Sequence, residues 1–421
     1  MDTLNVYREA TLVGHLEPVA GQGLSFRYAE SWLSSPRPRA ISLSLPLQAG
    51  PFDPQVARAW FANLLPEGEV REHVAHRLGV SARNEFALLR GIGGDCAGAL
   101  RLLAGPPAGH ETADLIPLPW AELEAKIAAT PRPSLLALMW QPGGLRLSLA
   151  GAQDKLPVHF VDGRLSLPAG SAASTHLLKI PSRSFPDLVQ NELFCLSLAR
   201  ESGVPVPPAQ LAPVATPILL VQRYDREVGA DGAVTRWHQE DFCQALGLPP
   251  EAKYENEGGP SLARLFAALA GGSTSPLPDR RDLLRWVLFN FLIGNADAHA
   301  KNVSLLHDGP GDDDGPRLAP FYDLVCTEAY EHLSGHLAQK IGGEYRHRHV
   351  ARRHWERFAA EIGVHPRYLR TVGLGLCDRV EARAASLAGE LGAAHGGGAT
   401  LRKVVAVVGR RVGAVRAAFA A

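Results

Sequence analysis

Apolar and polar positions alternate over the first part of the chain in the way that half-buried strands require. The segments 4–16 and 24–28 alternate, and 42–47 is another short alternating segment. Two segments, 56–65 and 70–78, instead carry apolar residues at helical spacing. This mixture predicts a small α/β unit at the N-terminus.

The pattern changes after a Pro- and Gly-rich stretch, 105–118, which predicts a linker or an exposed loop. Short strands are expected next, at 157–161 and 176–180, with Asp162-Gly163 as a strong hairpin signal. Beyond Phe242 the apolar spacing becomes mainly helical. The chain therefore predicts an α+β protein, with a β-rich half followed by a mainly α-helical half.

Composition sets limits on the class of protein. The 421 residues include 43 Lys and Arg and 43 Asp and Glu, so the chain carries no overall charge of the kind typical of nucleic-acid binders. None of the five cysteines lies in a CxxC pair, which argues against a zinc ribbon or a disulfide framework. No secretory signal and no apolar stretch of membrane-spanning length is seen. We expect a soluble, cytoplasmic protein without a membrane partner.

The strongest chemical signal is a polar run, 294–302, between an apolar helix and an apolar strand. Polar groups are costly in such a place unless they are paired or used. Asp297 and Asn302 are separated as the catalytic Asp and the metal-binding Asn are in the protein-kinase loop. A carboxylate there accepts the proton of an attacking hydroxyl, and a neutral oxygen ligand holds Mg²⁺. The run predicts an ATP- and magnesium-dependent kinase with a two-lobed, protein-kinase-like fold.

A second acidic residue supports the first. After Asn302 the chain is expected to run out along 303–307 and return along 318–321, which would bring Asp323 back beside Asn302. A second Asp after the catalytic loop is the other magnesium ligand of kinases. A capped helix end with a structural Asp is the alternative interpretation.

Three upstream segments are candidates for the nucleotide site. Lys179 lies in a predicted strand, and Glu192 lies on the helix that follows, which is the arrangement of the kinase Lys–Glu pair. The segment 148–155 has small residues at a strand turn and then a polar, basic tail, as a phosphate cradle requires, although it is no Walker A motif. The strand end at 222–224 would serve as the hinge that contacts adenine. Each segment also fits an ordinary strand end or turn.

Taken together, these residues resemble the HipA family, the serine/threonine kinase toxins of bacterial type II toxin–antitoxin modules. The resemblance covers nearly the whole chain. It is carried by Phe26-Arg27-Tyr28, 42–47, 63–66, 148–155, Gln239-Glu240-Asp241, Lys253-Tyr254-Glu255, Gly258-Gly259-Pro260, 294–302 and Pro320-Phe321-Tyr322-Asp323. It implies a HipA-type N-terminal subdomain (1–107), a connecting segment (108–144), an N-lobe core with the phosphate cradle (145–241) and a helical C-lobe with the catalytic loop (242–421).

The resemblance also implies roles for single residues. Asp297 would be the catalytic base, Asn302 and Asp323 the magnesium ligands, and Glu192 the acid that pairs with the phosphate-binding Lys179. The nucleotide would further contact Ala150, Gly151, Ala152, Gln153, Asp154, Lys155, Gln222, Arg223, Tyr224, His299, Lys301 and Tyr322. Ser148 matches the serine that family members phosphorylate on themselves. A phosphate there adds negative charge beside the ATP site, which explains self-inactivation.

Family membership further implies partners and a target. A small helix-turn-helix antitoxin, HipB-like, would neutralise the toxin and link it to operator DNA. The substrate would be an aminoacyl-tRNA synthetase, notably the glutamyl enzyme, and its phosphorylation would stop translation and lead to growth arrest and persistence.

Two other functions stay open. Phosphoinositide kinases resemble the catalytic loop, so a lipid or small-molecule kinase is one alternative, although the N-terminal half and the Ser148 cradle argue against it. An inactive kinase that acts as a transcriptional corepressor is the other. The basic run 346–354 is interpreted as the solvated start of a helix, with contact to DNA phosphates or to an acidic target as the alternative.

Overall fold

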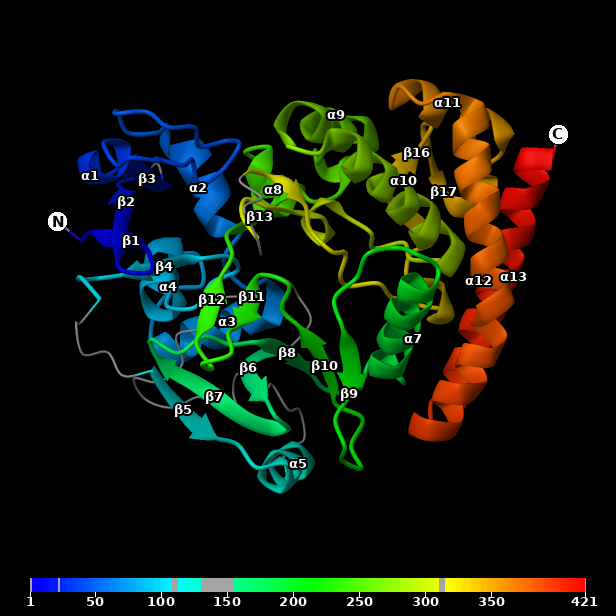
Figure 1. The fold of residues 1–421 in the computed structure, drawn as a ribbon, viewed down its shortest axis with the longest axis horizontal. Helices are drawn as coiled ribbons and strands as arrows, with labels where there is room; N and C mark the ends of the chain where they lie inside the picture. The colour runs from blue at the N-terminus through cyan, green and yellow to red at the C-terminus, as the bar shows by residue number, and fades with distance from the viewer. Residues whose placement is uncertain (1, 22, 108–112, 130–154, 310–314, 421) are drawn as a thin grey trace. The chain divides into compact units, whose positions relative to one another are not determined.

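The computed structural model describes residues 2–21, 23–107, 113–129, 155–309 and 315–420 (Figure 1). The chain forms two compact units, each built from separate segments. The first comprises Met1–Lys179, Gln222–Pro250 and Leu305–Gly315. The second comprises Ile180–Val221, Glu251–Ser304 and Pro316–Ala421. The candidate site residues are distributed over both units.

The N-terminal part of the first unit is a small α/β structure, as its sequence predicts. Its antiparallel sheet has the strand order β3-β2-β1-β4, made by β1 (Leu4–Arg8), β2 (Thr11–Val19), β3 (Gly23–Tyr28) and β4 (Leu100–Leu103). The helices are α1 (Glu30–Leu33), α2 (Pro54–Ala62), α3 (Gly68–Leu78) and α4 (Glu85–Ile92). Segment 4–16 holds two strands because the chain turns at Glu9, whose φ is 53°.

The alternating segment 42–47 is not a strand, and its hydrogen bonds give the reason. The Ser42 hydroxyl and the Leu43 backbone N–H both donate to the carboxylate of Glu240. The Ser44 hydroxyl donates to the backbone oxygen of Gln244 at 2.7 Å. The polar positions of this segment are therefore engaged with buried groups, whereas alternation in a half-buried strand leaves them to solvent.

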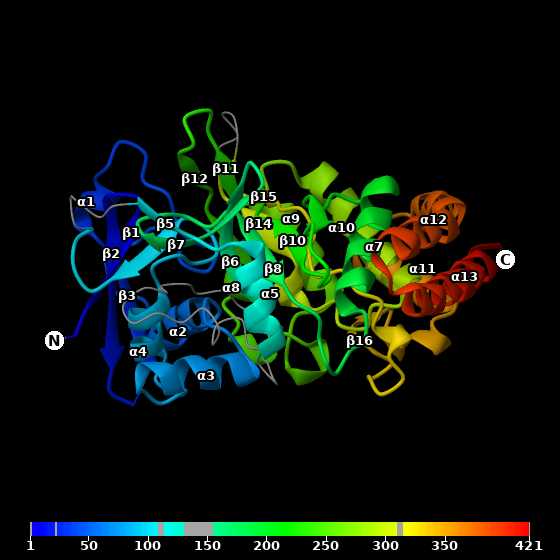
Figure 2. The same cartoon turned by 90° about the horizontal axis from the view of Figure 1, so that it is seen from below.

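A second group of strands in the first unit has the order β5-β7-β6-β8. These strands are β5 (Ala113–Pro117), β6 (Lys155–Val161), β7 (Arg164–Gly170) and β8 (His176–Lys179), with α5 (Trp120–Ala129) after β5 (Figure 2). The hairpin turn between β6 and β7 is confirmed, since Asp162 and Gly163 have φ values of 50° and 74°. The segment 105–118 is not wholly a loop, because β5 pairs antiparallel with β7.

The first unit also contains the ribbon of β11 (Arg226–Val228) and β12 (Val234–Arg236), then β13 (Gln239–Asp241) and α8 (Phe242–Ala245). The short strand β14 (Ser304–Leu306) crosses the boundary between the units: Ser304 is the last residue of the second-unit segment Glu251–Ser304, and Leu305 begins a first-unit segment. Asp241 caps α8 through a reciprocal pair of hydrogen bonds with Gln244, which satisfies the free N–H groups at the helix start.

The second unit is mainly helical, as expected for the C-terminal half. Its helices are α7 (Leu188–Glu201), α9 (Leu262–Gly272), α10 (Pro276–Ile293), α11 (Arg352–Glu361), α12 (Pro366–His395) and α13 (Gly398–Ala420). Its strands are β9 (Ala209–Leu211), β10 (Leu219–Gln222), β15 (Arg317–Leu318), β16 (His336–Ile341) and β17 (Glu344–Arg346). The long helices α12 and α13 lie side by side, and both pack against α10 (Figures 1 and 2).

Helix α10 is the element that positions the loop carrying Asp297. From Leu283 to Ile293 nearly every side chain is buried, which fits a central helix surrounded by others. Within the described residues, no helix combines the length and apolarity needed to cross a membrane.

Candidate active site

The loop that carries Asp297 starts at a glycine that the structure requires. Gly294 ends α10 with φ 69°, in the left-handed region where glycine is favoured. A Cβ atom on this residue would lie 2.7 Å from Cγ1 of Val407 on α13. Backbone geometry and space therefore both exclude a side chain here, and the chain leaves the helix in one fixed direction.

Three asparagines fix the backbone of the loop. The Asn295 side-chain amide donates to Oδ1 of Asn290, one turn back on α10, at 2.7 Å. The backbone N–H of Asp297 donates to Oδ1 of Asn295 at 3.0 Å, and the Asn302 amide donates to the backbone oxygen of Asp297, also at 3.0 Å. Because all of these partners lie on or beside a buried helix, the loop is held rigidly although its centre is exposed.

The carboxylate of Asp297 is exposed and has one close partner. The hydroxyl of Tyr254 donates to its Oδ1 at 2.6 Å. The ring of His299 meets the Tyr254 ring edge-on, with 5.2 Å between centroids. The spacing of residues within the loop gave no sign of Tyr254, which lies 43 positions upstream. The sequence pointed to Tyr254 only through the Lys253-Tyr254-Glu255 motif, which is one of the motifs that carry the family resemblance.

The chain returns to the loop as the sequence predicts. The backbone N–H of Ala319 donates to the oxygen of Ser304 at 2.9 Å. The Tyr322 hydroxyl donates to the backbone oxygen of Lys301 at 2.6 Å. The hydroxyl oxygens of Tyr322 and Ser304 are 2.7 Å apart, at hydrogen-bond distance. These bonds place the backbone next to Asp323 against the loop that carries Asn302.

Asp323 has an unusual backbone conformation, with φ 53°. Left-handed conformations cost a non-glycine residue on the order of 1 kcal/mol and are concentrated at functional sites. Its backbone oxygen lies 3.5 Å from the Asn295 amide, within the scaffold of the catalytic loop. The strained position is therefore part of the site.

Asn302 and Asp323 offer oxygen atoms, which are the ligands that Mg²⁺ prefers. No group of three or more His, Cys, Asp or Glu side chains that could hold a metal occurs among the described residues. Mg²⁺ is commonly held by only one or two protein oxygens, with phosphates and water completing its shell. The Asn302 amide nitrogen is fixed on Asp297, which leaves its oxygen as the group that can act as a ligand.

In the first unit, two predicted nucleotide residues face each other across strands. Lys155 of β6 and Lys179 of β8 are direct partners in the antiparallel ladder. Lys179 is buried, at 2% exposure. Contact of either lysine with the phosphates of ATP stays a prediction.

The predicted hinge residue Arg223 has a structural side chain. Its guanidinium is buried and bonds to both carboxylate oxygens of Asp225, at 2.9 and 2.7 Å, and to the Ser174 hydroxyl at 2.8 Å. Although burial opposes ionisation, the nearby Arg226 and Arg223 hold the pKa of Asp95 well below its usual range. The Arg223 side chain therefore belongs to a buried ionic cluster, and a role in binding adenine is left to the backbone of this segment.

The remaining predicted site residues are placed as follows. Glu192 is buried on α7 in the second unit, whereas Lys179 is in the first, so their pairing stays a prediction. His299 and Lys301 are buried, and Tyr322, Gln222 and Tyr224 are at least partly exposed. Their contact with ATP also stays a prediction. Ser148 and the residues Ala150, Gly151, Ala152, Gln153 and Asp154 lie outside the described residues.

Two family models match the chain. One is the HipA N-terminal domain, over residues 4–103, and the other is the HipA-like C-terminal domain, over residues 147–384. The second model alone spans more than half of the chain and includes Asp297, Asn302 and Asp323.

Individual relatives agree with the family models. A putative kinase, Y4mE of Sinorhizobium fredii, is 43% identical over 86% of this chain and 86% of its own length. The serine/threonine-protein kinase toxin HipA of Shewanella oneidensis is 32% identical over 82% of this chain and 79% of its own length. A solved complex of HipA, HipB and operator DNA from Shewanella oneidensis MR-1 contains a chain with a TM-score of 0.83 and 28% identity, with full coverage of both chains.

Proposed function

Because the chain belongs to the HipA family and is a serine/threonine-protein kinase, we propose that Asp297 is the residue that activates the attacking hydroxyl of a protein substrate. The observation that carries this proposal is the exposed carboxylate of Asp297 on a loop whose backbone is fixed on both sides. A general base must present an accessible oxygen in a defined direction, and this arrangement supplies it.

The two oxygens of the Asp297 carboxylate have different tasks in this proposal. Oδ1 accepts the hydrogen bond from Tyr254 and is thereby oriented. Oδ2 then accepts the hydrogen bond of a serine or threonine hydroxyl and takes up its proton as the oxygen attacks phosphorus. Tyr254 is a positioning residue, because it acts through Asp297 and not on the substrate.

We further propose that Asn302 and Asp323 hold Mg²⁺. Mg²⁺ held by these two residues would supply positive charge that stabilises the phosphates during transfer. Asn302 would serve two functions at once, since its amide nitrogen fixes the backbone of Asp297 and its oxygen is left to hold the ion. Lys155 and Lys179, which lie opposite each other in the first unit, supply positive charge for the phosphates of ATP.

The partners proposed for this chain follow from its relatives. The similarity to the HipA chain of the solved complex supports a HipB-like antitoxin as partner, with operator DNA contacted through that antitoxin. An aminoacyl-tRNA synthetase, such as the glutamyl enzyme, is the proposed target, with arrest of translation and growth and persistence as the consequence. Phosphorylation of Ser148 is the proposed means of self-inactivation.

Transfer of labelled γ-phosphate from ATP tests the function and separates the alternatives. We expect label to enter protein, in wild type, only when Mg²⁺ is present. We expect Asp323→Asn to require at least about tenfold more Mg²⁺, because one ionic ligand is lost. Label in a lipid extract or a small molecule, with none in protein, would instead favour the lipid or small-molecule kinase. ATP binding without transfer to any acceptor would favour the corepressor.

A further inference from the structure

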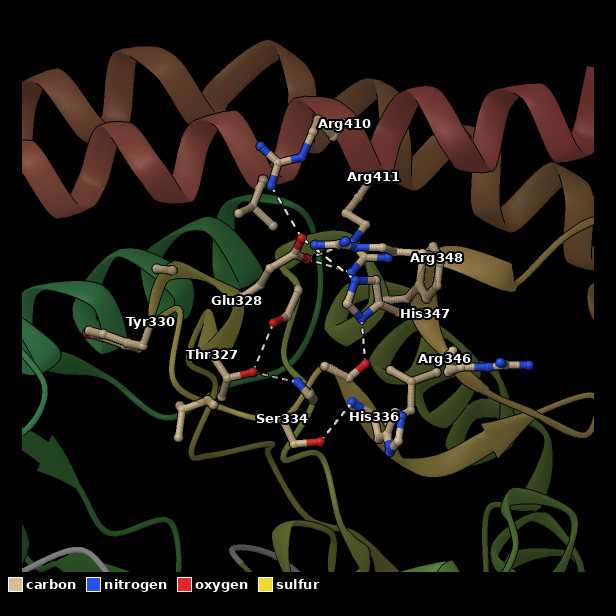
Figure 3. A pocket seen from close by; sticks show the side chains of 18 of the residues that line it. Thr327, Glu328, Tyr330, Ser334, His336, Arg346, His347, Arg348, Arg410 and Arg411 are labelled. Atoms are coloured by element: carbon tan, nitrogen blue, oxygen red, sulfur yellow. Dashed lines mark hydrogen bonds and ion pairs between the residues drawn. The ribbon is translucent and has the colours of Figure 1, made fainter.

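A cavity of about 680 Å³ lies beside the catalytic loop within the second unit (Figure 3). Its lining includes Gly294 and Ala296, the two residues that flank Asn295 just before Asp297. The other walls are the segment 327–337, which follows Asp323, the residues 346–349 and one face of α13. None of these residues has a role in the phosphate transfer described above.

Hydrogen bonds fix this cavity relative to Asp297. The backbone N–H of Ala296 donates to the Thr327 hydroxyl at 2.8 Å, and that hydroxyl donates to the oxygen of Gly294 at 3.1 Å. The backbone N–H of Ala338 donates to the oxygen of Ala296 at 2.9 Å. The wall of the cavity and the catalytic loop therefore form one rigid structure.

Cationic side chains outnumber acidic ones around the cavity. Arginine and lysine are represented by Arg346, Arg348, Lys403, Arg410 and Arg411, whereas the acids are Glu328 and Glu331. Of these cations, Arg346 is paired with Glu344, which lies outside the lining, at 3.2 Å. Arg410 and Arg411 reach from α13 to the same carboxylate, that of Glu328, at 3.3 and 2.5 Å (Figure 3). One carboxylate shared by two guanidinium groups leaves an excess of positive charge.

Two of these five cations account for most of the excess. Arg348 and Lys403 are exposed, and no acidic partner is seen for either one among the residues that the structure describes. Buried beside them, His347 bonds through Nδ1 to the backbone oxygen of Gly335 at 2.6 Å. Its Nε2 makes no hydrogen bond in the described structure and lies 3.7 Å from Glu328. Because Nδ1 donates to the Gly335 oxygen, Nε2 of the neutral ring carries a lone pair and cannot donate to an anion, so the positive charge at this edge of the cavity comes from Arg348 and Lys403.

We propose that this cavity binds acidic side chains of the protein substrate, close in sequence to the hydroxyl that is phosphorylated. The proposal rests on the function assigned to Asp297. Ala296 lines the cavity and directly precedes Asp297, so the cavity lies next to the loop that presents the proposed base. An extended chain advances about 3.3–3.6 Å per residue, so acids within a few positions of the hydroxyl are within reach.

The apolar part of the lining favours a peptide over nucleic acid. Leu333 and Leu337 line the cavity together with Val407, and they match the aliphatic portions of peptide side chains. Phosphate contacts alone would need only an exposed basic surface. The basic run that starts at Arg346 is thereby divided. Arg346–His349 lines the cavity and contains a short 3₁₀ helix at His347–His349, whereas the α-helix begins at Arg352.

The test measures peptide binding separately from catalysis, with the full chain. A fluorescent peptide with one central serine flanked by glutamates is compared, by anisotropy, with a matched peptide flanked by lysines. We expect at least about tenfold tighter binding of the glutamate peptide, with a difference that falls as salt screens the charges. The double variant Arg348→Glu/Lys403→Glu should lose this preference. The matched control is Arg353→Glu/Arg402→Glu, which makes the same charge change at exposed positions outside the cavity and should keep it.

The outcomes separate the two proposals. Equal affinity for both peptides, or a glutamate preference that survives in Arg348→Glu/Lys403→Glu, would overturn the inference. Tighter binding of a labelled DNA duplex, lost in that variant alone, would also overturn it and assign the cavity to nucleic acid. Phosphate transfer to serine is measured in the same samples. If phosphate is transferred to serine but the glutamate peptide is not preferred, the inference about the cavity fails and the kinase function stands. If the glutamate peptide is preferred but no phosphate is transferred, the proposed kinase function fails.

Discussion

Tyr254 donates a hydrogen bond of 2.6 Å to Oδ1 of Asp297, from a segment 43 residues earlier in the chain. The bond occupies one carboxylate oxygen, and the proposed mechanism assigns the other oxygen to the acceptor hydroxyl. Tyr254 is itself held by edge-on contact with the His299 ring, so the loop and the tyrosine support each other. The proposed base thus depends on a residue outside its own motif.

Replacement of Tyr254 by phenylalanine tests this dependence. A hydrogen bond to a charged group is worth about 1.5–3 kcal/mol, which corresponds to roughly a 10- to 100-fold loss in kcat. We expect the KM for ATP to change little, because Tyr254 contacts the base and not the nucleotide. The melting temperature should be nearly unchanged, since the ring and its packing are kept. Equal losses in kcat and in ATP affinity would contradict the positioning role.

Gly294→Ala tests the rigid exit from α10. The new Cβ would lie 2.7 Å from Val407 Cγ1, at a residue with φ 69°. We expect a loss of roughly 1–3 kcal/mol in the free energy of unfolding, from left-handed strain and overpacking together, and a parallel loss of phosphate transfer. Chemical denaturation measures the first and labelled ATP the second.

Gly413→Ala is the matched control for this change. Gly413 lies on the same helix α13 as Val407, and a Cβ there would meet nothing within 4 Å. We expect it to stabilise the protein by about 0.5–1 kcal/mol, because alanine is the better helix former. Equal stability of the two variants would show that the exit at Gly294 is not constrained.

Glu328→Gln tests the ion pair at the wall of the cavity. The Arg411 side chain is only 7% exposed and depends on Glu328 for its charge partner. Burial alone would raise the pKa of Glu328, but hydrogen bonds from Arg411 hold this pKa below its ordinary value of 4.5. A carboxylate with a lowered folded-state pKa stabilises the protein above its unfolded-state pKa, and that contribution is lost as pH falls through the folded-state value.

We therefore expect Glu328→Gln to cost on the order of 1–3 kcal/mol at neutral pH, with a cost that shrinks below about pH 4.5. Thermal unfolding across pH measures it. Glu381→Gln is the control. The Glu381 side chain, which pairs with Arg416, is 52% exposed, and such exposed ion pairs are worth about 0–1 kcal/mol. A pH-independent cost for Glu328→Gln would contradict the ionic account.

The catalytic loop was predictable because its chemistry is local. The spacing of Asp297 and Asn302, and the return of the chain to Asp323, are set by short-range geometry that a sequence displays directly. The α+β character was likewise predictable from the change in apolar spacing along the chain. The boundaries of the two units were not predictable, because each unit combines three separate segments of the chain.

The errors lie where distant partners decide the local structure. Segment 42–47 alternates like a strand, but Glu240, about 200 positions later, engages its polar groups. The Pro- and Gly-rich stretch around β5 forms a strand because β7 offers it an antiparallel edge.

The mass of the intact protein after incubation with ATP and Mg²⁺ tests the central claim most directly, in wild type, in Asp297→Asn and in the control Asp378→Asn. Asp378 is an exposed acid on α12, paired only at the surface with Arg416. We predict that wild type and Asp378→Asn each gain a phosphate and that Asp297→Asn, equally folded, gains none. Phosphate on Asp297→Asn at the wild-type rate would contradict the assignment of Asp297 as the catalytic base.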